Sequence, residues 1–237
     1  MSKRFKGKLC VSCAGAKSTT ADHIISRGFF LISDRSNLPQ APACNTCNNE
    51  KSRLEHYVTS LLPFGGRHSN AQTNLATMVP KRLRKNAKLH RKLTQETGTA
   101  WSEEGAGLVV PVMTVPFDSR RFETLFSFIV KGLAWHHWGI YLTSKHFAKA
   151  MMVSKAGEGV FDQMFFSRSV RDHVNVNLGN GTFVYEGVQD FECPELTVWR
   201  LSIYGGVRMG GDPTAPGQYS SLVGVVTGPK SVQQTAA

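Results

Sequence analysis

The pattern of apolar and polar positions predicts a strand, a loop and a helix near the start of the chain. Residues 21–26 (ADHIIS) are typical of a short strand. Residues 27–43 contain the Asp, Ser, Asn and Pro of turns, which predicts a loop that ends in an extended segment. Residues 48–62 have helical spacing of apolar side chains. The predicted apolar face of this helix comprises Leu54, Tyr57, Val58, Leu61 and Leu62.

The middle of the chain is polar and predicts little buried structure. Residues 63–74 (PFGGRHSNAQTN) are rich in Gly, Ser and Asn and read as a linker loop. Residues 80–93 (PKRLRKNAKLHRKL) have no helix breaker after Pro80, and Leu83, Ala87 and Leu93 are spaced for one side of a helix. The pattern therefore predicts one continuous basic helix.

The second half of the chain predicts two helices and a small antiparallel sheet, an α+β domain. Residues 118–138 form an amphipathic helix that begins at an Asp118 or Ser119 cap and is ended by Gly139. Residues 143–153 read as a second helix. Five further runs resemble strands separated by Gly, Asn and Pro. These runs are residues 163–170, 173–178, 181–188, 197–207 and 221–228.

These elements divide the 237 residues into three parts. We expect a small module at 1–62, a linker with a basic helix at 63–100, and an α+β domain of unassigned role at 101–237. No run of eighteen apolar residues occurs, so no membrane span is expected. The basic N-terminus is followed by no apolar segment, which argues against a secretory signal and predicts a cytoplasmic protein.

Charge is distributed unevenly along the chain. Residues 1–100 hold 17 Lys and Arg against 5 Asp and Glu, a net charge of +12, whereas residues 101–237 hold 11 against 12. A basic half joined to a neutral half favours a polyanionic partner, nucleic acid above all, over a generally solvated basic protein.

Four of the five cysteines form two Cys-x-x-Cys pairs, CVSC at 10–13 and CNTC at 44–47. Disulfides are disfavoured in the cytosol, and one such pair alone would also suit a redox motif. Two pairs supply the four thiolates that structural zinc prefers. We therefore expect a structural zinc held by Cys10, Cys13, Cys44 and Cys47, worth on the order of 10 kcal/mol to folding.

Taken in order, four motifs resemble the HNH endonuclease family. They are the CVSC pair, ADHI at 21–24, SNL at 36–38 and CNTCNNEKS at 44–52. The resemblance covers about residues 8–62. It implies a small zinc-clipped ββα-metal (His-Me finger) module, here followed by the helix-plus-antiparallel-sheet domain.

The resemblance also implies a metal-dependent endonuclease that hydrolyses phosphodiester bonds in DNA. His23 would be the general base, because an imidazole titrates near neutral pH. Asp22 and Asn48 would hold Mg²⁺ or another divalent cation through oxygen atoms. Asn37 would orient the His23 loop, and Lys51 would meet a phosphate. Some relatives carry a further ligand one helical turn after Asn48, where this chain has Ser52, with Glu50 as a neighbouring carboxylate.

Structural alternatives to these roles remain open. His23 could be an ordinary polar strand residue, Asn48 could cap the helix after the second cysteine pair, and Asn37 could be only a turn residue. The basic segment could be a solvated surface helix or a flexible linker rather than a phosphate-binding helix. The nucleic-acid-binding residues predicted on that segment are Lys81, Arg82, Arg84, Lys85, Lys88, Arg91 and Lys92.

Two other functions stay open beside the endonuclease. One is a zinc-stabilised module that binds nucleic acid without catalysis, and the other is an interaction protein that uses residues 101–237. DNA is the expected partner, RNA is not excluded by the sequence, and no membrane partner is expected. Residues 101–237 would be the place for a homodimer contact or a protein partner.

Overall fold

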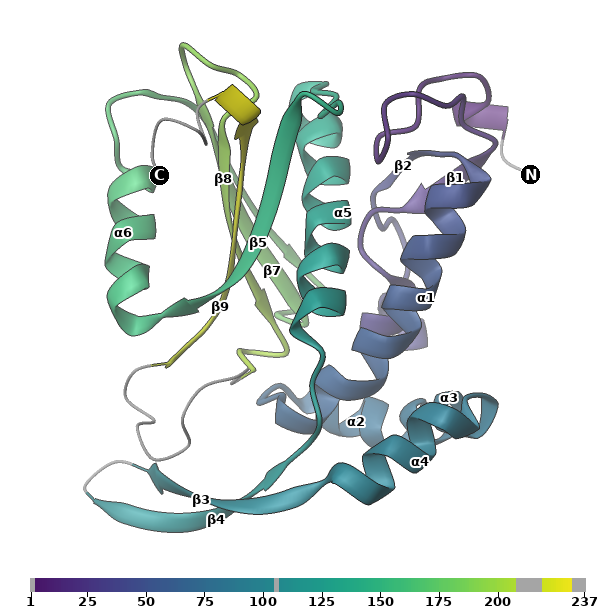
Figure 1. Cartoon of the computed structure of the whole chain (residues 1–237), viewed down its shortest axis with the longest axis vertical. Helices are drawn as coiled ribbons and strands as arrows, with labels where there is room; N and C mark the ends of the chain where they lie inside the picture. Colours follow the sequence, from purple (N-terminus) through teal and green to yellow (C-terminus); the bar gives the residue numbers. More distant parts are fainter. Residues whose placement is uncertain (1–2, 105–106, 208–218, 232–237) are drawn as a thin grey trace.

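The computed structural model describes residues 3–104, 107–207 and 219–231 and has mixed helices and strands (Figure 1). No helix of the described part is both long and apolar enough to cross a membrane. Among the described residues, four short 3-10 helices accompany the main elements. They are η1 (Lys3–Phe5), η2 (Arg27–Phe29), η3 (Ile32–Asp34) and η4 (Leu62–Gly65).

The first part of the chain forms a ββα unit. Strand β1 (Thr20–His23) pairs antiparallel with β2 (Gln40–Ala43), with His23 opposite Gln40. Helix α1 (Asn45–Leu61) follows directly. The predicted strand at 21–26 is therefore real but ends at His23, because Ile24 and Ile25 turn into the core, where both are at most 2% exposed. The predicted loop contains η2 and η3.

The expected linker at 63–74 is wrong, because these residues contain η4 and most of helix α2 (Ser69–Thr77). His68 caps α2, its Nδ1 accepting a hydrogen bond from the Asn70 amide at 3.1 Å. Asn74 is completely buried, and its Nδ2 donates to the Phe29 carbonyl at 3.0 Å. Part of the polar composition of this segment therefore serves a helix cap and a buried hydrogen bond.

The predicted continuous basic helix is two helices, α3 (Val79–Lys85) and α4 (Ala87–Glu96). Asn86 breaks the helix, with φ −131° and ψ 74°. Its Oδ1 accepts a hydrogen bond from the Leu89 amide at 3.0 Å, so Asn86 is the N-cap of α4. An Asn side chain competes with the helical backbone in this way more readily than Lys or Leu does.

A hairpin and a long helix begin the second half. Strands β3 (Gly98–Glu104) and β4 (Leu108–Thr114) form an antiparallel hairpin that the sequence pattern did not indicate. Helix α5 (Ser119–Trp138) is as predicted: the Asp118 carboxylate accepts a hydrogen bond from the Arg121 amide at 3.2 Å, and Gly139 ends the helix at φ 71°. Its predicted apolar face is completely buried. That face comprises Phe122, Leu125, Phe126, Ile129 and Leu133.

The predicted helix at 143–153 is wrong, since strand β5 (His146–Ser154) occupies most of it. Helix α6 (Lys155–Phe165) follows, capped by Ser154, so the strand predicted at 163–170 is wrong as well. The apolar residues of β5 fit either spacing, and pairing with the distant strand β9 (Tyr219–Pro229) decides for the strand. Gly157 and Gly159 lower the local helix propensity of α6, which packing of Phe161 and Phe165 offsets.

The remaining strands are close to their predicted positions and complete a five-stranded antiparallel sheet in the order β5-β9-β8-β7-β6. They are β6 (Val170–Leu178), β7 (Phe183–Asp190) and β8 (Thr197–Ile203). Helices α5 and α6 lie on opposite faces of this sheet (Figure 1). On the α5 side, one buried cluster contains residues of the ββα unit, of α5 and of the sheet, for example Ile25, Ile129 and Trp199. The ββα unit and the sheet therefore share a core.

Candidate functional site

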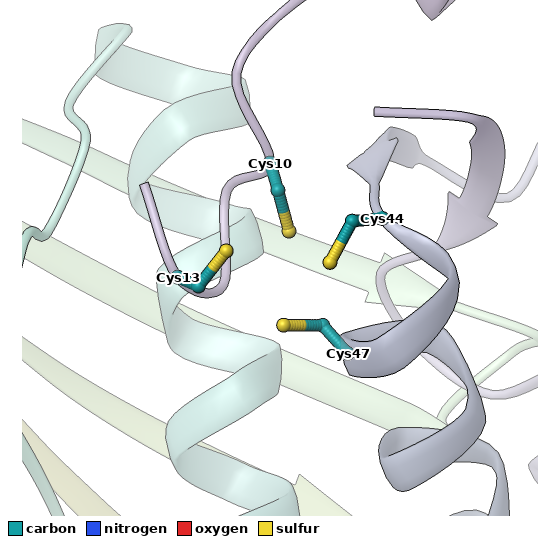
Figure 2. Close-up of side chains that lie close together, drawn as sticks. All are labelled: Cys10, Cys13, Cys44 and Cys47. Carbon is teal, nitrogen blue, oxygen red and sulfur yellow. The ribbon is translucent and has the colours of Figure 1, made fainter. Parts of the chain in front are cut away.

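Two loops and the start of α1 bring four cysteines together (Figure 2). All four Sγ atoms lie within 4.8 Å of one another, an arrangement that is compatible with zinc. Cys10 and Cys13 lie in a tight turn in which the Ala14 amide donates to the Cys10 carbonyl at 2.8 Å. Cys44 precedes the first residue of α1, and Cys47 lies in its first turn. The predicted convergence of the two pairs is confirmed.

The surroundings of the cysteines shift the thiol pKa values in opposite directions: burial raises the pKa of Cys10 and Cys47, whereas that of Cys13 is lowered. Burial would raise the pKa of the Cys13 thiol, but the Ala16 and Gly15 amides outweigh burial and lower it to about 7. Lys131 of α5, which the sequence pattern did not single out, is half-buried beside the cluster. Its Nζ donates to the Ser12 carbonyl at 3.1 Å, and burial lowers its pKa while the neighbouring thiols raise it. A lysine there offsets the net negative charge that four thiolates around Zn²⁺ would carry.

A buried lysine joins two carboxylates beside the ββα hairpin. The Lys51 Nζ lies 2.8 Å from Asp22 Oδ2 and 2.6 Å from Glu55 Oε1, and its side chain is 3% exposed. It also donates to the His23 carbonyl at 2.6 Å. All three donors of the ammonium are used inside the protein, which argues against the predicted contact of Lys51 with a phosphate. Glu55, which the sequence analysis did not single out, is its main partner.

Burial and pairing act in opposite directions on this cluster. Burial lowers the pKa of Lys51, but Glu55 and Asp22 outweigh burial and raise it. Burial raises the pKa of Glu55, and Lys51 only partly offsets that rise. The lysine therefore stays charged. It is the cationic partner of both carboxylates in a place with little water.

The His23 imidazole contacts Gln40 of the neighbouring strand β2. Side chains alternate along β1, so Thr20 and Asp22 contact α1, whereas the His23 ring meets Gln40 of β2. Burial, Arg27 and Lys51 lower the pKa of His23, against the opposing effect of Asp22. The ring is thus held neutral, and Gln40 Nε2 donates to its Nε2 at 3.2 Å. A water molecule that His23 activates would compete with Gln40 for this nitrogen.

The two predicted asparagines differ in position. Asn48 lies on the β1 side of α1, and its Nδ2 meets Thr20 Oγ1 at 3.4 Å. It is the fourth residue of α1, with Cys44 at the N-cap position, so the capping alternative is excluded. Asn37 is exposed and has φ 59° in a turn, and within the described residues its side chain has no hydrogen bond. The structure therefore favours the turn alternative for Asn37 over an orienting role.

The basic segment is mostly exposed, with one exception. Arg82 is half-buried and donates to two backbone carbonyls, those of Thr59 and Gly28, at 2.7 Å each. The guanidinium thus ties α3 to the ββα unit, and its nucleic-acid contact stays a prediction. The exposed members are Lys81, Arg84, Lys85, Lys88, Arg91 and Lys92.

Comparisons of the chain with family models, with curated proteins and with solved structures found no match. The resemblance to HNH endonucleases therefore rests on the sequence motifs alone.

Proposed function

We propose that the chain is a metal-dependent HNH-like endonuclease that hydrolyses phosphodiester bonds in DNA. The observation that supports this most is the packing of the β1–β2 hairpin on α1. It puts Asp22 and Asn48, which are 26 positions apart in the sequence, on facing elements beside the four-cysteine cluster. The first hundred residues carry a net positive charge, which attracts the phosphate backbone of DNA.

Asp22 and Asn48 supply oxygen donors, which fit a hard divalent cation such as Mg²⁺. Lys51 shares Asp22 Oδ2, so Oδ1 is the carboxylate oxygen that remains for a metal. When bound, the cation would polarise the scissile phosphate and stabilise the leaving oxygen. His23 would take the proton from the attacking water at Nε2, after that water displaces the Gln40 amide. Lys51 would hold the backbone of His23 and the carboxylate of Asp22 in place.

A second candidate function is a zinc-stabilised nucleic-acid-binding module without catalysis. Two observations favour it: the Lys51 ammonium already neutralises Asp22, and the His23 ring meets Gln40 on the other side of the hairpin. In that case the four-cysteine cluster and the basic helices would serve binding alone.

The test is nicking of supercoiled plasmid by the purified chain, with Mg²⁺ or with EDTA. His23→Ala should lower the rate about 10²–10⁴-fold, the range for loss of a general base. Asp22→Asn should raise the Mg²⁺ concentration that is needed. His90→Ala is the matched control, because His90 is an exposed histidine on α4.

Zinc content and the thermal unfolding midpoint are measured for every variant, so that a lost fold is not taken for a lost base. Equal rates for wild type and folded His23→Ala, or no Mg²⁺-dependent nicking at all, would reject the endonuclease and leave the binding module.

A further inference from the structure

A groove of about 930 Å³ lies between the outer face of α1, the α3–α4 break and the start of α5. Its floor is partly apolar, with Leu54, Tyr57 and Leu89. Its rim is cationic, although the contributing residues are far apart in the sequence. The rim cations are Arg53, Lys85, Lys88, Lys92 and Arg121.

Positive charge dominates this groove. Against the five cations stand the carboxylates of Glu50 and Asp118. Asp118 pairs with Arg121 at 3.2 Å, and Lys92 reaches Glu96 at 3.7 Å, but these side chains are between 38% and 56% exposed, so both pairs are weak. Burial, and after it Arg82 and Lys85, lowers the pKa of His56 in the same groove. The positive charge near the groove therefore contributes to the lowered pKa of His56.

The break at Asn86 divides the basic segment into two sets of side chains. Lys85, Lys88 and Lys92 line the groove from both sides of the break. The other exposed cations of the segment do not line it. They are Lys81, Arg84 and Arg91.

The groove is separate from the candidate catalytic site. Lys51 and Glu55 of α1 meet at the Asp22 side, whereas Arg53 and Tyr57 line the groove. Residues two positions apart on a helix point about 200° apart, so the groove and the Asp22 site lie on opposite faces of α1. DNA held in the groove would be anchored away from the bond to be cut.

We propose that this groove, the α1–α4 groove, binds the phosphate backbone of DNA as an anchoring surface. The inference rests on the proposed function for the identity of the polyanion. Five convergent cations around a concave surface match a run of phosphates.

Fluorescence anisotropy of a labelled 20-base-pair duplex and of one of its strands, both in EDTA, measures binding without cutting. The groove triplet is K85Q/K88Q/K92Q. We expect it to weaken binding about tenfold or more and to lower the slope of log K against log salt by about 2–3, at about 0.9 per lost phosphate contact on a duplex. In nicking assays the same triplet should raise KM and leave kcat unchanged.

Two matched triplets remove the same charge elsewhere. K145Q/K149Q/R171Q, on exposed residues just before β5, in β5 and in β6, should leave the salt slope within about 1 of wild type. K81Q/R84Q/R91Q, on the same helices as the groove triplet, should weaken binding less than the groove triplet does.

Equal or larger losses in the second matched triplet would overturn the groove, as would unchanged binding by the groove triplet. The groove would also be overturned if polyglutamate competed as well as DNA, because the partner would then be an acidic polypeptide. Absence of DNA binding by the wild-type chain would overturn it as well. The proposed function fails separately: His23→Ala that still nicks DNA would reject the endonuclease while the groove triplet still reports on binding.

Discussion

At the residue scale, the arrangement around Lys51 is decided by charge pairing. A carboxylate that loses its partner in a low-dielectric setting costs several kcal/mol, so one buried ammonium holds Asp22, Glu55 and the His23 backbone together. The lysine is therefore a structural residue of the ββα unit. The motif around it has this structural role whether or not it also has a catalytic one.

Lys51→Met should therefore destabilise the chain by about 3–5 kcal/mol, because it leaves two carboxylates next to each other without their cation. Urea unfolding measures the loss. Lys92→Met is the control, since Lys92 forms an exposed pair with Glu96 and should cost less than about 1 kcal/mol. Similar losses in both variants would contradict the buried pairing.

His137 predicts a pH dependence of stability. Burial, and then the neighbouring His136, lowers its pKa from 6.5 to about 4, against a small opposing effect of Asp172, while its Nε2 lies 3.0 Å from the Tyr185 hydroxyl. Between these two values the unfolded chain binds a proton that the folded chain does not, so stability is full above pH 6.5 and falls as the pH drops towards 4.

His137→Gln should flatten the fall in the thermal midpoint between pH 7 and pH 5, whereas His90→Gln, an exposed control, should not. Thermal melts at half-unit steps measure the difference. The same slope in wild type and His137→Gln would mean that other groups carry the pH dependence.

At the element scale, close approach decides how α6 sits on the sheet. A Cβ on Gly224 of β9 would lie 2.2 Å from the Phe161 ring of α6, so only glycine lets the helix pack at this distance. Gly159 of the same helix has open space beside it. Packing therefore requires glycine at position 224, whereas it does not require glycine at position 159.

Gly224→Ala should destabilise the chain by about 1–3 kcal/mol, the usual cost of overpacking. Gly159→Ala should stabilise it by about 0.5–1 kcal/mol, since Ala loses less backbone entropy than Gly in a helix. Urea unfolding of both variants measures the opposite signs. Two effects of the same sign would contradict this account of α6.

At the scale of the whole molecule, the ββα unit and the five-stranded sheet depend on each other. Val11 follows Cys10 directly and belongs to the same buried cluster as Ile25, Ile129 and Trp199, and Lys131 of α5 reaches the loop between Cys10 and Cys13. If the four cysteines bind a cation, its loss should therefore weaken the shared core and not only the N-terminal part.

We expect about one zinc per chain by elemental analysis. A chelator should lower the thermal midpoint by about 10 °C or more, given about 2–4 °C per kcal/mol for a chain of this size. Cys47→Ser should abolish zinc binding, whereas Cys193→Ser, outside the cluster, should retain it. A chelator-resistant midpoint, or zinc retained by Cys47→Ser, would count against this account of the cluster.

The sequence alone determined what depends on neighbouring residues or on a fixed spacing. The two Cys-x-x-Cys pairs predicted the cluster, because their spacing serves one tetrahedral ion. The helix of α5 and its caps followed from a local pattern of apolar residues between Asp118 and Gly139. The strands β6 to β9 were indicated by runs of β-branched and aromatic residues.

Only the tertiary structure decided what depends on distant partners. Residues 146–154 have apolar spacing for either a helix or a strand, and pairing with β9 selects the strand. The polar segment 63–74 is mostly helical, because Asn74 donates a hydrogen bond to the carbonyl of Phe29, 45 positions away. The sequence predicts that Lys51 and Arg82 contact nucleic acid, whereas in the fold Lys51 pairs with two partly buried carboxylates and Arg82 donates to two backbone carbonyls. A one-dimensional pattern contains no record of such long-range desolvation, which is why these residues could be assigned only in three dimensions.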